Sequence, residues 1–250
     1  MHRSGGWLTS ESGAGEVLLR GGEVHLSIPV TASDCYHNAQ ISDYQATAPR
    51  FGNRPPLRLS LRARGQGDIK GTAGFGFWNQ VFVPGRRRFR LPQAIWFFFG
   101  GPANDIALAS GVPGHGWKAA TINARGWRFY GLLPLAPLGF LAMRSQTLYQ
   151  KLWPVGQRAI NVREALLDSM FLQDFHSYAI EWREDRVVFS VDDAVVLCSE
   201  RAPGSALGFI AWLDNQYAIV TPQGRFGWGL LDGPEPQKLI LRDIEITRLA

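Results

Sequence analysis

Apolar and polar residues alternate over short segments of the chain, and each segment ends at turn residues. Residues 57–64, LRLSLRAR, place leucines on one face of a strand and arginine or serine on the other. Residues 94–99, AIWFFF, are apolar on both faces and predict a strand in the centre of a sheet. Further strands are predicted over residues 23–30, 72–79, 117–123, 178–182, 187–191, 194–198, 207–213 and 238–246. About ten to twelve strands with regular turns predict an all-β jelly-roll sandwich.

One segment departs from this pattern. Residues 131–143, GLLPLAPLGFLAM, carry no charge and include two prolines. Residues 145–165 have a helical pattern, which we expect to be broken at Pro154. We therefore predict a mostly helical, apolar insertion over residues 127–169. The uncharged part is too short to span a bilayer.

The rest of the chain predicts one domain over residues 17–250, preceded by a mobile, Gly- and Ser-rich tail over residues 1–16. That tail has no apolar core of the kind found in secretory signals. No run of about 18 apolar residues occurs, so no transmembrane helix is expected. The expected location is the cytoplasm, with attachment to the inner face of the membrane as an alternative.

Composition excludes a disordered chain, because 46% of residues are hydrophobic, 12% are aromatic and only 19% are charged. The net charge is +5, and most of the basic residues are arginines. Arg86, Arg87, Arg88 and Arg90 are interpreted as a solvated hairpin edge. No lysine-rich tail or RNA-binding motif accompanies the charge, so nucleic acid is not an expected partner.

Cysteine and histidine give no metal-binding pattern. Cys35 and Cys198 are far apart in sequence and form no Cys-x-x-Cys motif, so we expect two free thiols in a reducing compartment. The five histidines do not have the spacing of metal ligands. We predict no metal and no cofactor.

A family resemblance appears in residues 175–197, FHSYAIEWREDRVVFSVDDAVVL. The segment is similar to the "F-H-x-Y-x-x-x-W … V-D-G" strand pair of family 16 glycoside hydrolases, in the concanavalin A-like lectin/glucanase superfamily. Residues 91–96, LPQAIW, resemble the "W-P-A-F-W" strand of that laminarinase-like family, and residues 239–246 resemble its closing strand. The matching positions in the strand pair are Phe175, His176, Tyr178, Trp182, Val191 and Asp192, with Asp193 where glycine is usual. The resemblance implies a jelly roll with a glycan-binding ancestry.

The chain departs from this family at its catalytic motif. The retaining enzymes carry E-x-D-x-x-E on one strand, which places two carboxyl groups on one face for double displacement. This sequence contains no E-x-D-x-x-E. Near the expected position, residues 104–108 offer only Asp105, and residues 117–122 offer no carboxylate. Asp243 and Glu245 have a suitable spacing but lie on the closing strand, where a surface pair is expected.

Two segments have the chemistry of a sugar site, in which aromatic rings meet the apolar face of a pyranose and polar groups bind its hydroxyls. Residues 212–217, WLDNQY, place the first, third and fifth side chains on one face if the strand stays extended. A strand that ends in an Asp-Asn turn explains them equally well. Residues 36–40 have similar alternation, with an ordinary polar edge strand as the alternative. The predicted ligand-binding residues are Tyr36, Asn38, Gln40, Trp78, Trp96, Lys118, Trp212, Gln216 and Tyr217.

A third group could perform acid–base chemistry. Asp105 lies near the expected active strand, and His115 and Lys118 follow it within a turn-prone segment. A loop histidine is more often simply solvated. We take Asp105, His115 and Asp214 as the catalytic candidates.

Three functions therefore remain open. The first is a jelly roll of lectin/glucanase type that binds or processes a glycan or glycoconjugate. The second is an enzyme for a lipophilic substrate, such as an isoprenoid or polyketide cyclase or hydratase, with an aspartic acid in an aromatic cavity. The third is a non-catalytic protein that docks to a membrane or partner through residues 131–143, which could instead form a lid or an oligomer interface.

Overall fold

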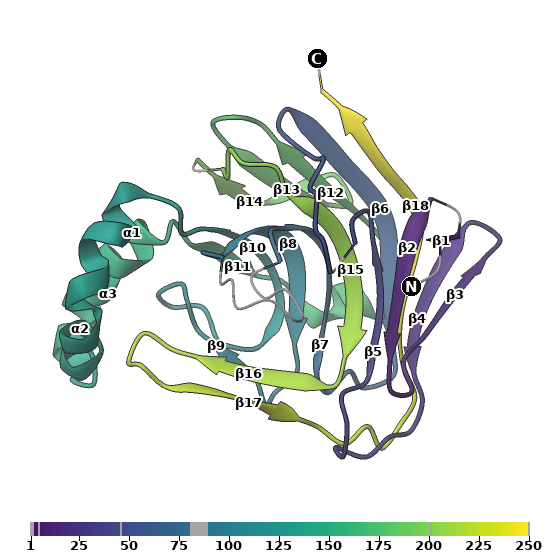
Figure 1. Ribbon diagram of the computed structural model, residues 1–250, viewed down its shortest axis with the longest axis horizontal. Coiled ribbons are helices and arrows are strands. Elements are labelled where there is room, and N and C mark those ends of the chain that lie inside the picture. Colours follow the sequence, from purple (N-terminus) through teal and green to yellow (C-terminus); the bar gives the residue numbers. More distant parts are fainter. Residues whose placement is uncertain (1–2, 5, 46, 81–89, 201, 250) are drawn as a thin grey trace.

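Two large sheets stack on each other, and a small third sheet and a group of helices lie to one side (Figure 1). The computed structural model describes residues 3–4, 6–45, 47–80, 90–200 and 202–249. All strand pairs are antiparallel in the two large sheets. This arrangement confirms the predicted all-β sandwich.

The order of the strands within each sheet differs from their order in the sequence. The eight-stranded sheet contains β1 (Arg3–Ser4), β2 (Trp7–Ser12), β5 (Asn38–Ser42), β15 (Gly208–Asp214), β7 (Thr72–Trp78), β8 (Gln93–Gly100), β10 (Gly116–Asn123) and β11 (Arg163–Leu166). The seven-stranded sheet contains β14 (Ala194–Ser199), β13 (Val187–Val191), β12 (His176–Trp182), β6 (Leu57–Gln66), β18 (Gln237–Arg248), β4 (Glu23–Ile28) and β3 (Glu16–Arg20). The three-stranded sheet contains β17 (Phe226–Leu230), β16 (Gln216–Val220) and β9 (Asp105–Ile106).

The core lies between the two large sheets. Buried and half-buried residues alternate along β6, as the leucine pattern of this segment predicts. From the opposite sheet, the Phe97 ring lies 4.9 Å from the Tyr178 ring and 5.3 Å from the Phe189 ring, measured between centroids. β8 pairs with β7 on one side and β10 on the other, which confirms the predicted central position of residues 94–99.

The apolar insertion is mostly helical, as predicted, and stands at the side of the sandwich (Figure 1). It contains α1 (Trp127–Leu132), the 3-10 turn η1 (Leu133–Leu135), α2 (Ala136–Ala142) and α3 (Gln146–Ala159), and a second 3-10 turn, η2 (Ser169–Leu172), follows. Pro134 and Pro137 fall within the first two positions of η1 and α2. Proline is tolerated there because its missing N–H would have no partner inside the helix.

Two details of the predicted insertion are wrong. Pro154 does not break the helix, because α3 continues through it to Ala159. The neighbouring Trp153 is buried, and its indole N–H donates to the Leu108 carbonyl at 3.0 Å, which anchors the helix at this point. Residues 163–166 form β11 instead of helix and pair with β10.

The mobile tail predicted over residues 1–16 is also wrong where the structure describes it. β2 pairs with β5 in the eight-stranded sheet. The Trp7 ring packs on Phe209 at 4.9 Å between centroids, so strand pairing and this contact together hold a segment that is otherwise rich in Gly and Ser. β3 begins at Glu16.

Two smaller expectations concern charged residues. Arg86, Arg87 and Arg88 lie outside the described residues, whereas Arg90 is half-buried and donates to the Asn79 carbonyl at 3.2 Å. Arg90 is therefore a packed residue and not part of a solvated edge. Asp243 and Glu245 are exposed on β18, as expected of a surface pair.

Candidate functional site on the concave face

The eight-stranded sheet has an aromatic face on the side away from the core. Side chains alternate along β8, so Ile95 and Phe97 enter the core while Trp96 and Phe98 lie on the opposite side. In Figure 1 the sheet curves on this side toward β9 and β16, and we call this side the concave face. Ile106 of β9 packs against the same aromatic cluster.

Four rings make up the aromatic floor of the concave face, which we define as Trp78, Trp96, Phe98 and Trp212. Trp96 is central, with ring centroids 6.0 Å from Trp78, 5.8 Å from Phe98 and 5.4 Å from Trp212. Trp212 and Phe98 are buried, whereas Trp78 and Trp96 are half-buried. The two half-buried indoles are therefore the accessible part of the floor.

Two glycines of β7 let the indoles lie against the backbone. A Cβ atom at Gly74 would lie 2.7 Å from Cη2 of Trp212, and one at Gly76 would lie 2.8 Å from Cβ of Trp96. The nearest atoms are backbone atoms of β8, since the Cβ would lie 2.4 Å from the Phe97 carbonyl oxygen at Gly74 and 2.3 Å from the Ile95 carbonyl oxygen at Gly76. Neither position could carry a side chain without displacing the backbone of β8. The glycines of the segment TAGFGFW are thus needed for the floor, because they admit the neighbouring strand this closely.

A buried carboxylate closes one end of the floor. Asp214 Oδ1 accepts from the Thr72 hydroxyl at 2.9 Å and the Thr72 and Gln216 N–H groups at 3.1 and 3.2 Å. Its Oδ2 accepts from the Tyr36 hydroxyl at 3.3 Å. Burial raises the pKa of Asp214 to about 6, although these hydrogen bonds act in the opposite direction.

A buried ion pair lies toward the other side of the sheet. Lys118 of β10 points to the concave face and lies 3.9 Å from Glu164 of β11, with both side chains almost fully buried. Burial lowers the pKa of Lys118 and raises the pKa of Glu164, and each charge opposes the shift of its partner. The Lys118 ammonium also donates to the Ile106 carbonyl at 3.2 Å.

The structure brings together several of the predicted ligand residues. Trp212 is directly opposite Gln40 across the β15–β5 pair, and Asp214 is opposite Asn38. Directly paired residues share one face of a sheet, so these side chains border the aromatic floor with Tyr36. The two segments 36–40 and 212–214 therefore form one site instead of two.

Other predicted residues lie elsewhere. β15 ends at Asp214, so Gln216 and Tyr217 belong to β16 in another sheet and do not continue the face of Trp212. His115 is exposed in the loop before β10, while Asp105 pairs with Arg225 at 3.5 Å. The charge of Asp105 also acts on Lys118, whose ammonium donates to the carbonyl of the next residue, Ile106, at 3.2 Å. The acid–base role of Asp105, His115 and Lys118 stays a prediction.

Glu164 is a candidate that the sequence analysis missed. We expected helix at this position, so the pairing of β11 with β10 could not be foreseen. The only signal was that Glu164 follows a run of 58 residues, 106–163, without any Asp or Glu. An acid that ends such a stretch is a candidate partner for a lysine buried within it, here Lys118.

Asp34, Cys35 and His37 could offer metal ligands, since their donor atoms lie within 4.8 Å of one another. The sequence analysis did not foresee this group. However, His37 Nδ1 accepts from the Ala14 N–H at 3.0 Å, and Nε2 lies 3.2 Å from the Ala32 carbonyl. Both ring nitrogens already serve the fold, so these residues fit a metal poorly. Cys35 and Cys198 are both free thiols, as predicted.

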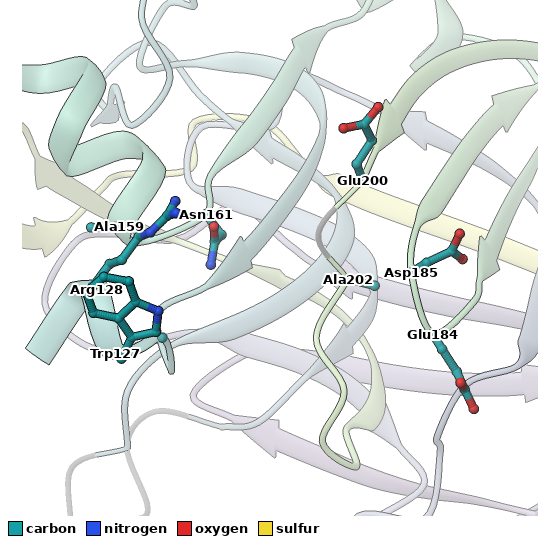
Figure 2. A pocket seen from close by; sticks show the side chains of 9 residues that line it. Trp127, Arg128, Ala159, Asn161, Glu184, Asp185, Glu200 and Ala202 are labelled. Atoms are coloured by element: carbon teal, nitrogen blue, oxygen red, sulfur yellow. The ribbon is translucent and has the colours of Figure 1, made fainter.

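A separate pocket of about 410 Å³ lies where α1 begins (Figure 2). Trp127, Arg128 and Asn161 line one side of it, and the acidic residues Glu184, Asp185 and Glu200 line the other. All three acids are exposed, so they are solvated by water and need no bound cation. The pocket is distinct from the aromatic floor.

Comparisons with known proteins agree with this architecture. The family model of glycosyl hydrolases family 16 matches residues 139–207, which include much of the segment that carries the resemblance. A search of curated protein sequences finds no match.

Solved structures extend the similarity to the whole fold. A family 16 endo-glucanase from Bacteroides ovatus has a TM-score of 0.53 at 10% identity, covering 98% of this chain and 96% of that one. A legume lectin-like domain from Entamoeba histolytica has a TM-score of 0.52 at 7% identity, covering 98% and 91%. A laminarinase from Flavobacterium sp. has a TM-score of 0.50 at 13% identity, covering 93% and 81%. The chain has the concanavalin A-like jelly-roll fold of the lectin/glucanase superfamily.

Proposed function

We propose that the concave face of this jelly roll binds a glycan or glycoconjugate. The aromatic floor carries the proposal, because half-buried Trp78 and Trp96 present flat apolar surfaces to the C–H faces of sugar rings. Gln40, half-buried at one border, provides an amide for hydroxyl groups, and Asn38 lies buried on the same strand. The comparisons support the same class of ligand, since the similar folds include an endo-glucanase and a lectin-like domain.

We propose binding rather than hydrolysis by the usual retaining mechanism. That mechanism needs two carboxyl groups about 5–5.5 Å apart on one face. β10, the strand next to β8, contributes Lys118 to the concave face and contains neither Asp nor Glu. Glu164 is held by the Lys118 ammonium at 3.9 Å and by the Ala109 N–H at 2.9 Å, which makes it the buried partner of a lysine.

The alternative enzyme for a lipophilic substrate requires an aspartic acid that can donate a proton. Asp214 has the raised pKa that such a role needs, but four donors surround its two oxygens. A carboxylate held in this way positions Tyr36 and Thr72 at the border of the floor. We therefore give Asp214 a positioning role in glycan binding.

A glycan array followed by calorimetric titration with the best ligand tests the proposal. Trp96→Ala is expected to weaken binding at least tenfold, because it removes the central ring of the floor. Leu18→Ala is the control, since this leucine is exposed on β3 of the other large sheet, and its loss should leave affinity unchanged.

Three outcomes would contradict the proposal. These are the absence of glycan binding across the array, equal binding by wild type and Trp96→Ala, or a loss in Leu18→Ala as large as that in Trp96→Ala. Release of reducing ends from the bound glycan would instead show turnover, and Glu164→Gln would then identify whether this carboxylate takes part.

A further inference from the structure

The helices of the insertion expose an unusual amount of apolar surface. α1, η1 and α2 have no buried residue at all. Trp127 is 80% exposed and Leu138 is 68% exposed, and Leu133 and Leu135 are exposed between them. Apolar side chains in such number on one short segment mark an interaction site in a soluble protein.

This apolar surface continues onto a neighbouring hairpin. The ring of Phe226 in β17 lies 5.7 Å from the ring of Phe140 in α2. Phe226 and Trp228 are both strongly exposed and share one face of β17, because they alternate with Gly227. Together the helices and the hairpin border an apolar groove of about 570 Å³. We define the docking surface as Trp127, Leu133, Leu135, Leu138, Phe226 and Trp228.

The charged residues of the segment that carries the helices all have one sign. Residues 106–163 contain seven Lys or Arg residues and no Asp or Glu. Six of them are exposed, namely Arg125, Arg128, Arg144, Lys151, Arg158 and Arg163. Within the part of the chain that the structure describes, none of the six forms a salt bridge with an acidic side chain. Acidic residues lie at the edges of this surface: Glu184, Asp185 and Glu200 across the pocket at the start of α1 (Figure 2), and Asp105, which pairs with Arg225 next to Phe226.

We propose that the docking surface binds the surface of an anionic lipid bilayer. Exposed leucines and aromatic rings flanked by Arg and Lys are the features of a segment that lies in the membrane interface. The unpaired positive charges match acidic headgroups. A second copy of this chain is a poorer occupant, because two-fold pairing would bring the same cationic surfaces together.

The proposed attachment is peripheral. No helix among the described residues is long and apolar enough to cross a bilayer. Docking would place the membrane next to the hairpin that carries Phe226. Arg225, the residue before Phe226, lies 3.5 Å from Asp105 and so connects this hairpin to β9. The attachment does not depend on glycan binding, because none of the residues of the aromatic floor belongs to the docking surface.

Vesicle co-sedimentation tests the proposal with two probes: vesicles of phosphatidylcholine alone, and equimolar vesicles of phosphatidylcholine and phosphatidylglycerol. The protein is expected to sediment with the anionic vesicles and to be released by high salt. Leu138→Glu should reduce this binding at least tenfold, because it places a charge where an apolar side chain enters the interface. Val195→Glu is the matched control, since Val195 is exposed to a similar degree on the sandwich.

A second pair of variants tests the electrostatic part. Arg144→Gln combined with Lys151→Gln should weaken binding to anionic vesicles by about fivefold for each charge removed. Arg20→Gln combined with Arg54→Gln, two exposed charges outside the helices, should leave it unchanged.

Several results would overturn the proposal. They are the absence of binding to anionic vesicles, equal binding to both vesicle types, an equal loss in Val195→Glu, or reversible self-association that Leu138→Glu abolishes without any vesicle binding. Trp96→Ala should keep vesicle binding intact, so failure of glycan binding and failure of membrane binding are distinguishable.

Discussion

The aromatic floor and the docking surface are both rich in large apolar side chains, yet their surroundings differ. In the floor, each indole rests on the sheet and two of them donate to specific hydroxyl groups, as Trp212 does to Thr72 at 2.9 Å. On the docking surface, Trp127 and Trp228 are more than two thirds exposed and pack on little of the protein. The fold packs the side chains of the floor against one another, whereas it leaves the side chains of the docking surface without packing partners.

This difference separates residues that stabilise the fold from residues that await a ligand. Burial of an aromatic side chain contributes to folding only if the surrounding structure encloses it. An apolar residue that stays in water contributes almost nothing to folding and remains free to contribute to binding. Substitutions in the two regions should therefore affect different measurements.

The largest difference is expected between a core residue and a residue of the docking surface. Phe97 is fully buried under the floor among Phe75, Trp117, Tyr178 and Phe189. Phe97→Ala should lower the free energy of unfolding by about 3–5 kcal/mol. Leu138→Ala should change it by less than about 0.5 kcal/mol. Urea denaturation measures both, and a comparable loss in Leu138→Ala would show that the helices are part of the folded core.

The second prediction concerns Asp214, at the border of the floor. Burial raises the pKa of Asp214 from 3.8 to about 6, so between these values the folded state binds a proton more readily than the unfolded state. Its contribution to stability is therefore fully present below about pH 4 and is lost as the pH rises through 6, a change of about 3 kcal/mol.

The test compares wild type with Asp214→Asn, which cannot titrate. The free energy of unfolding of wild type relative to this variant should fall as the pH rises from 4 to 7. A difference that stays constant over this range would show that the pKa of Asp214 is not raised. Asp193→Asn is a suitable control, because Asp193 is an exposed turn residue.

The third prediction tests whether the floor needs its glycines. A Cβ atom at Gly74 would lie 2.4 Å from the Phe97 carbonyl oxygen and 2.7 Å from the Trp212 ring. Gly74→Ala should therefore cost about 1–3 kcal/mol of stability and weaken glycan binding. Gly52→Ala, at an exposed position with nothing within 4 Å, is the control. Equal stability of the two variants would mean that the ring can shift away freely.

Much of the fold could be predicted from the sequence because its signals are local. The leucine alternation in β6 and the segment that forms β12 and β13 identify strands without reference to the rest of the chain. The aromatic floor was predicted in part for the same reason, since Trp96 and Trp212 belong to such strands. The resemblance of residues 175–197 then supplied the topology that alternation alone does not contain.

The remaining features depend on contacts between distant residues. Glu164 reaches Lys118 only because β11 pairs with β10 after the whole helical insertion. β2 is held by its pairing with β5 and by the contact of Trp7 with Phe209, and neither contact is visible in a local pattern. Gln216 leaves the floor because the chain passes into another sheet after Asp214, although an extended strand would have kept it there.

The fourth prediction has the smallest expected effect and concerns a glycine in the helices that carry the docking surface. Gly131 lies in α1, and a Cβ atom there would meet nothing within 4 Å. Gly131→Ala should raise the free energy of unfolding by about 0.5–1 kcal/mol, because alanine restricts the unfolded chain and favours the helix. Vesicle binding should be unchanged or slightly tighter in the same variant. Destabilisation by this alanine would mean that α1 packs against the protein more closely than its exposed side chains indicate, and the docking surface would then belong to the fold in the same way as the aromatic floor.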